Sequence, residues 1–195
     1  MNLIAEIGLN HLGSDRLAIS IVKSCVKLDI DGVTLQIQPN EYYDGKKNYK
    51  KKLKKETYIK ISKILKKKKK LFGLALMHEE SFREFKNIKF DFIKVLSTAF
   101  NNINLIKKIY KKTKTIVSTG VADLNEIKKM AKKFPKVNFI HTSLNNEIKN
   151  TNLLAINMLK KNLKNQVSFG LHSNEKEIML AAIPLQPHSI FFYIK

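Results

Sequence analysis

Eight short apolar runs alternate with seven amphipathic segments of helical length, and this alternation restricts the fold more than any other feature of the chain. The apolar runs predict strands at residues 3–8, 32–38, 71–77, 90–97, 115–119, 137–142, 166–171 and 189–194. Apolar residues three or four positions apart predict helices at residues 15–28, 57–69, 79–87, 102–112, 123–133, 151–163 and 174–183. Repeated strand–helix–strand units indicate an α/β protein with a parallel sheet.

An open doubly wound sheet and a closed (β/α)8 TIM barrel both contain such units, and the count of eight strands favours the barrel. No Pro-rich or Gly-rich linker divides the chain, so we expect a single TIM-barrel domain over residues 1–195. The sequence stops at the eighth strand, which predicts a barrel lacking the final helix. One segment of barrel wall would then expose apolar surface that a second copy, in a homodimer, could bury.

The formal net charge of +21 raises the question of nucleic-acid binding, but only two of the 37 basic residues are arginines. Base and phosphate recognition favours the bidentate arginine fork, so we expect no specific nucleic-acid partner. The lysines are densest at 46–55 and 66–70, between predicted strands, where a solvated helix face is the simplest interpretation. A weakly bound anionic partner stays open.

Targeting and redox features indicate a cytoplasmic protein. No apolar run approaches the roughly 20 residues that span a bilayer, and no signal peptide precedes the first strand, so we expect no membrane partner. The single cysteine, Cys25, excludes an internal disulfide and fits a reducing compartment. It falls on an apolar helix face, which predicts a buried structural thiol.

Polar residues gather where the predicted strands end, and in a barrel that is where binding and catalytic groups lie. The candidates from five strands and their loops are Glu6, Asn10, His11, Gln36, Lys94, Ser97, Ser118, Thr119, Gly120 and His141. We expect them to converge on one end of the barrel. His11 could instead stabilise its turn, and His141 could be a core histidine.

Lys94 gives the strongest single signal, because it lies between Ile93 and Val95 in a strand expected to be buried on both faces. A buried ammonium group requires an anion. That anion is either a structural partner, Glu6 or Asp91, or a phosphate or carboxylate of a ligand. Glu6 raises the same question, because a carboxylate in an apolar strand must be paired or used.

Several segments resemble the sialic acid synthase family, which includes the pseudaminic and legionaminic acid synthases. IAEIGLNHLG (4–13) is similar to the first strand and loop of that family, and IKVLS (93–97) resembles its fourth-strand segment. IVSTGVADLNEI (116–127), FIHTS (139–143) and the pair at 152–153 resemble further family segments in the same order. The resemblance extends over essentially the whole sequence.

This resemblance implies a (β/α)8 barrel that condenses phosphoenolpyruvate with an N-acylated amino sugar in nonulosonic acid biosynthesis. Such a protein is a transferase that forms a C–C bond. Lys94, Ser97 and Ser118 would then meet the carboxylate or phosphate of phosphoenolpyruvate, whereas Glu6 and Gln36 would face the sugar.

The family also requires a divalent metal, Mn²⁺ or Mg²⁺, yet its metal-binding histidines are not evident in this sequence. The family segment after the seventh strand aligns with residues 172–174, which leaves His172 as a single candidate ligand. One histidine is a poor metal site. The C-terminal antifreeze-like domain of the family does not follow the barrel either. The alternative is therefore a catalytically degenerate or truncated barrel that binds a sugar or small anion without turnover.

Overall fold

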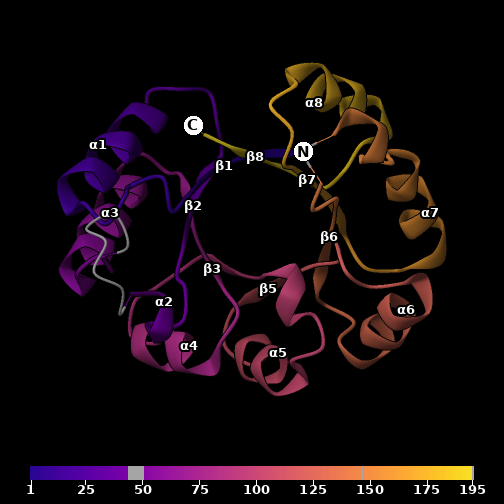
Figure 1. Cartoon of the computed structure of the whole chain (residues 1–195), viewed down its shortest axis with the longest axis horizontal. Helices are drawn as coiled ribbons and strands as arrows, with labels where there is room; N and C mark the ends of the chain where they lie inside the picture. Colours follow the sequence, from indigo (N-terminus) through magenta and orange to yellow (C-terminus); the bar gives the residue numbers. More distant parts are fainter. Residues whose placement is uncertain (44–50, 146, 195) are drawn as a thin grey trace.

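The computed structural model describes residues 1–43, 51–145 and 147–194. Part of the lysine run at 46–55 therefore lies outside the described residues, as does Lys195. Eight parallel strands form a closed barrel in chain order, which confirms the predicted (β/α)8 fold (Figure 1). The strands are β1 (Asn2–Gly8), β2 (Gly32–Gln36), β3 (Leu71–Leu76), β4 (Phe92–Val95), β5 (Lys114–Ser118), β6 (Asn138–Thr142), β7 (Val167–Leu171) and β8 (Ser189–Tyr193).

Helices surround the strands and bury their apolar faces against them (Figure 1). Their bounds are α1 (Asp15–Cys25), α2 (Asn40–Tyr43), α3 (Lys55–Lys67), α4 (Glu79–Phe85), α5 (Ile103–Tyr110), α6 (Leu124–Lys133), α7 (Leu154–Asn162) and α8 (Lys176–Ala182). The one-turn helix α2 was not expected from the sequence. None of the described helices is long and apolar enough to cross a membrane.

Local capping explains where several helices begin. Ser14 accepts a hydrogen bond from the backbone N–H of Leu17 and caps α1, and Asp123 forms a capping box with Glu126 at α6. The sequence placed the start of the sixth predicted helix, which corresponds to α7, at residue 151. It begins at Leu154 instead, because residues 148–150 form a separate 3₁₀ turn.

The barrel interior is layered because alternate side chains of each strand point inward. Its central layer is apolar and consists of Ile4, Phe92, Ile116, Ile140 and Phe191. Two residues further along, the same five strands carry polar side chains at Glu6, Lys94, Ser118, Thr142 and Tyr193. These lie at the C-terminal end of the barrel, which is called the mouth below.

The wall between α8 and α1 differs from the rest of the ring. Each of the first seven strands is followed by a helix, and β8 ends at Tyr193, close to the last described residue. Among the described residues no helix lies outside β8 between α8 and α1 (Figure 1). Leu3 of β1 and Phe192 of β8 are only partly buried there.

Candidate functional site

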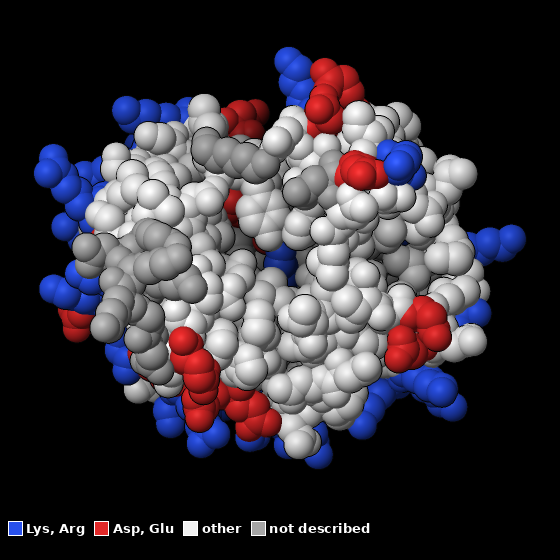
Figure 2. All heavy atoms as spheres, viewed as in Figure 1, with Lys and Arg blue, Asp and Glu red and all other residues white. Residues whose placement is uncertain are grey.

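A cavity of about 210 Å³ opens at the mouth of the barrel. Figure 2 shows a hollow at the centre of this end, with blue and red atoms visible inside it. Its walls come from seven of the eight strands or the residues directly after them. The lining residues are Gln36, Met77, Lys94, Leu96, Ser97, Thr98, Ser118, Ile140, Thr142, Leu144, Gly170, His172 and Tyr193.

A buried ion pair between Lys94 and Glu6 lies at the floor of this cavity. Both side chains are only about 5% exposed, at 5% for Lys94 and 4% for Glu6. The ammonium nitrogen also lies 5.5 Å from the ring centroid of Phe191, within the range of a cation–π contact. Asp91, the other sequence candidate for the pair, accepts a hydrogen bond from the backbone N–H of Phe72 instead.

Tyr193 and His172 complete this cluster, and the sequence did not single out Tyr193. The Tyr193 hydroxyl donates a hydrogen bond to Glu6, and burial together with the charge of Glu6 raises the pKa of Tyr193. The His172 ring lies edge-on to Tyr193, with 5.0 Å between centroids. Burial and the nearby charge of Lys94 lower the pKa of His172, so this imidazole is neutral at pH 7.

Hydroxyl groups form the wall beside Lys94. Ser97 accepts a hydrogen bond of 3.1 Å from the backbone N–H of Gly120, which holds its side chain in place. Ser118 lines the cavity from β5, and the Thr142 hydroxyl donates to the carbonyl of Gly170 at 3.0 Å. The Lys94 ammonium with the hydroxyls of Ser97 and Ser118 is suited to a small anion, because these groups can donate hydrogen bonds to it.

Two of the sequence candidates face away from the cavity. The Thr119 hydroxyl donates to the backbone carbonyl of Ile140 at 3.1 Å. His141 lies next to Ile140, which points into the barrel, so His141 points outward and its Nε2 lies 3.0 Å from the Thr151 carbonyl oxygen. Neither side chain lines the mouth cavity.

The loop after β1 is shaped by two glycines. Gly8 has a φ of +56° and Gly13 a φ of +74°, a region that residues with a Cβ rarely adopt. Between them His11 is buried, and its Nδ1 accepts a hydrogen bond from the Gly13 N–H at 3.0 Å. Asn10 donates to the carbonyl of Ile194 and so joins this loop to the end of β8. Asn10 and His11 therefore hold the loop beside the cavity without lining it.

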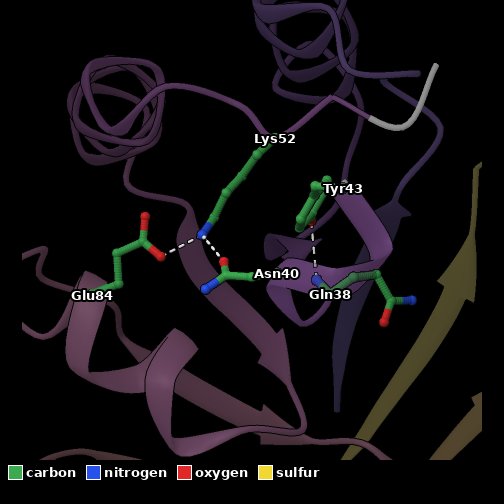
Figure 3. Close-up of polar contacts among 5 residues, drawn as sticks. All are labelled: Gln38, Asn40, Tyr43, Lys52 and Glu84. Carbon is green, nitrogen blue, oxygen red and sulfur yellow. Dashed lines mark hydrogen bonds and ion pairs between the residues drawn. The ribbon is translucent and has the colours of Figure 1, made fainter. Parts of the chain in front are cut away.

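Contacts on the other side of the mouth hold the connection that follows β2. Lys52 bridges Asn40 at 3.1 Å and Glu84 of α4, and the Gln38 backbone N–H donates to the Tyr43 hydroxyl at 3.0 Å (Figure 3). These contacts fix the described ends of this connection, close to Gln36 in the cavity wall.

A protein-family model described as the NeuB family matches residues 33–188. The chain belongs to the NeuB family. This confirms the resemblance to sialic acid synthases that the sequence segments indicated. No curated protein matches the chain in sequence.

Solved structures match the whole of this NeuB barrel. An N-acetylneuraminic acid synthetase from Leptospira borgpetersenii, in complex with citrate, superposes with a TM-score of 0.89 at 23% identity, covering 99% of this chain and 72% of that one. The spore coat polysaccharide biosynthesis protein SpsE of Bacillus subtilis gives 0.84 at 20% identity, covering 98% and 59%. A putative homologue of that protein from Chromobacterium violaceum gives 0.83 at 18%, covering 99% and 66%. The chain thus spans only part of each matched protein.

The divalent metal implied for NeuB proteins does not fit the residues of this mouth. Among the described residues no group of three or more His, Cys, Asp and Glu side chains is placed to hold a metal ion. The carboxylate that acts on His172 is that of Glu6, which is already bound by Lys94 and Tyr193. Mn²⁺ and Mg²⁺ prefer several oxygen ligands, and the ammonium of Lys94 would repel a cation here.

Proposed function

We propose that the mouth of this NeuB-family barrel binds phosphoenolpyruvate and that the protein condenses it with an N-acylated amino sugar. The observation that supports this proposal is the buried ammonium of Lys94 beside the hydroxyls of Ser97 and Ser118 in one cavity. An ammonium group has three donors, so Lys94 can keep Glu6 and still bind a phosphate or carboxylate oxygen. This cavity is the one that the structure supports best as a substrate site.

The size of the cavity indicates which of the two substrates it would hold. Its 210 Å³ is below the roughly 300–1,000 Å³ of pockets for larger ligands, which suits a three-carbon phosphate. The sugar would then lie above it, where Gln36 reaches the mouth and the loop of Asn10 and His11 forms the rim. Holding both reactants in this way lowers the entropic barrier to forming the bond.

Each polar group has a definite part in this proposal. Lys94 binds the anionic end of phosphoenolpyruvate, and Ser97 and Ser118 orient it. Glu6 forms an ion pair with Lys94 and lies within reach of the reacting centre. The Tyr193 hydroxyl, whose pKa is raised, carries its proton at neutral pH and serves as a donor beside Glu6.

The test is direct. Purified protein is incubated with phosphoenolpyruvate and N-acetylmannosamine or its bacterial analogues, with and without Mn²⁺, and phosphate release is followed. We expect release that Ser118→Ala reduces at least tenfold and that Lys108→Met, a surface change on α5, leaves unchanged. If no sugar leads to phosphate release, the proposed condensation is wrong.

A second candidate function is binding of the substrate without turnover. The mismatch between the mouth residues and a divalent metal ion favours this candidate. The Glu6 carboxylate is satisfied by Lys94 and Tyr193, and the described residues include no metal-binding cluster. Calorimetry then separates the candidates. Phosphoenolpyruvate binding that is weakened by Ser118→Ala, together with no phosphate release, is the result for a binding protein.

A cytoplasmic location and a homodimer complete the proposal. Phosphoenolpyruvate is a metabolite of the cell interior.

On α7 and α8 the apolar side chains of Leu154 and Leu180 are 72% and 57% exposed, and the apolar groove beside them has a volume of about 500 Å³. A second copy would cover this surface next to the open wall of the barrel. Light scattering would show a dimer that Leu154→Glu converts to a monomer.

A further inference from the structure

The end of the barrel opposite the mouth carries an unusual excess of lysine. This N-terminal face consists of the seven connections from a helix to the next strand; all its lysines lie in six of them, at residues 26–31, 68–70, 86–91, 111–113, 134–137 and 163–166, and the seventh is at 183–188. They contain ten lysines, which are Lys27, Lys68, Lys69, Lys70, Lys86, Lys89, Lys111, Lys112, Lys136 and Lys164. Against these the same connections contain only Asp29, Asp31 and Asp91.

The mouth carries fewer lysines outside one connection. Six of its connections, at residues 9–14, 77–78, 96–102, 119–123, 143–153 and 172–175, include Asp123, Glu147 and Glu175 but only one lysine, Lys149, among their described residues. The connection from β2 to α3, at 37–54, adds Lys51, Lys52 and Lys54 and one acid, Glu41, among its described residues. Figure 2 shows the lysines and arginines at the rim of this view, with little blue around the central hollow. Among the described residues, the excess of lysine over acid therefore lies at the N-terminal face, whereas the mouth connections carry about as many acids as lysines.

The helix dipole explains only part of this separation. Lysine is favoured in the last turn of a helix, and α3, α5, α6 and α7 each carry a pair of lysines in that turn. The ten connection lysines lie beyond those turns. None of them forms an ion pair among the described residues, whose pairs involve Lys52, Lys94, Lys108 and Lys149.

Two of the three acids of the N-terminal face are occupied by the backbone. Asp31 accepts from the N–H of Leu3 at 2.7 Å, and Asp91 accepts from the N–H of Phe72 at 2.8 Å. These bonds hold the two carboxylates beside the first residues of the strands. The ten lysines of the face therefore outnumber its acids without forming an ion pair with them among the described residues.

Two hollows on this face collect the lysines. One of about 290 Å³ is lined by Lys66, Lys69, Lys70 and Lys89, and one of about 460 Å³ by Lys86, Lys89 and Lys112. Lys89 and Asp91 belong to both, and the Asp91 carboxylate is bound by the backbone N–H of Phe72. Each hollow is large enough for a phosphate group and offers several ammonium donors to it.

From this face we infer a contact with the surface of an anionic phospholipid bilayer. The lysines come from six connections distributed around the ring, so a broad surface can meet many of them at once. Leu28 and Ile183, which are 56% and 41% exposed, lie at the same end and supply apolar contacts.

The aromatic residues of this face argue against a single-stranded nucleic acid as the partner. Phe90 and Phe134 are buried, and Tyr110 is packed against the core, so these rings are not available to stack on bases. A peripheral contact of this kind departs from the sequence expectation of no membrane partner, which rested on the lack of a spanning segment.

Vesicle co-sedimentation tests this inference independently of any catalytic activity. The protein is mixed with vesicles of phosphatidylcholine alone or with about 30% phosphatidylglycerol, at about 0.1 M and 0.5 M salt. We expect binding to the anionic vesicles only, and its loss at high salt because surface charges are then screened. Each lysine close to such a surface strengthens binding about fivefold.

A matched pair of variants locates the contact. Lys68, Lys86, Lys89 and Lys112 are changed to Gln in one variant, and Lys51, Lys55, Lys149 and Lys176 in the other, so that both lose the same charge. All eight side chains are exposed, and circular dichroism checks the fold. The first variant should lose vesicle affinity about 10²-fold to 10³-fold, and the second less than about tenfold.

Three results would overturn the inference. The wild-type protein could fail to bind anionic vesicles at about 0.1 M salt. Both variants could lose affinity equally, which would indicate net charge alone rather than the N-terminal face. An unrelated single-stranded RNA could bind ten times more tightly than the vesicles and compete with them, which would assign the face to nucleic acid.

Discussion

Replacing Lys94 by methionine tests the role of the buried ion pair most directly. The change keeps most of the side-chain volume and the contact with Phe191 but leaves the Glu6 carboxylate in the barrel interior without a cation. Breaking a buried pair from one side costs about 3–5 kcal/mol. Tyr193 continues to donate to Glu6 and offsets part of that loss, so we expect a decrease near the lower end, about 3 kcal/mol.

Urea unfolding measures this decrease, and a thermal melt should show a midpoint about 6–12 °C lower for a chain of this length. Two controls define the cause. Lys108→Met removes the exposed pair with Glu79, where screening limits the loss to about 1 kcal/mol or less. The double change Glu6→Gln with Lys94→Met removes both charges and should recover most of the stability.

The reasoning fails if Lys94→Met destabilises the protein no more than Lys108→Met does. It also fails if the double variant is as unstable as the single one, because the loss would then come from packing rather than from an unpaired carboxylate.

Three further predictions concern the loop after β1 and the mouth. Burial lowers the pKa of His11 from 6.5 to about 4, so the unfolded chain takes up a proton at His11 more readily than the folded protein does as the pH falls. Between pH 7.5 and 4.5 the free energy of unfolding of the wild type should therefore fall about 2–3 kcal/mol more than that of His11→Asn, as measured by denaturant titrations. Equal losses in the two proteins would contradict this. Gly13→Ala would place a Cβ 2.8 Å from the backbone nitrogen of Lys51 at a positive φ, and chemical denaturation should show a loss of about 1–3 kcal/mol; no loss would mean that the loop relaxes freely. Electron paramagnetic resonance of free Mn²⁺ should detect no site tighter than about 1 mM, whereas a tight site abolished by His172→Ala would show that the donor set does suit a metal.

The alternation of strands and helices was predictable from the sequence because apolar periodicity follows directly from burial. Each of the eight predicted strands and seven predicted helices corresponds to an observed element. The helix α2 was not predicted because a single turn is too short for a periodic pattern. The start of α7 was misplaced because Asn150 and Thr151 resemble a cap, although Asn150 ends a 3₁₀ turn and Thr151 follows it.

The direction of a side chain at a strand end was harder to predict than its presence there. Lys94 was identified because an ammonium in an apolar strand requires a partner, and one of the two sequence candidates, Glu6, provides it. His141 could have been assigned to the outer face by counting from Ile140, since alternate residues face opposite sides. The same counting from Phe191 would have directed Tyr193 inward, but its bond to Glu6 depends on closure of the barrel between β8 and β1.

The ion pair between Glu6 and Lys94 joins two strands that are not neighbours in the sheet and residues 88 positions apart in the chain. It can form only when β1 through β4 have curved towards one another, so we expect it to form after the transition state for folding. Contacts made after the transition state govern the rate of unfolding more than the rate of folding. Lys94→Met should therefore accelerate unfolding while leaving the refolding rate nearly unchanged, which makes this pair a determinant of how long the closed barrel persists.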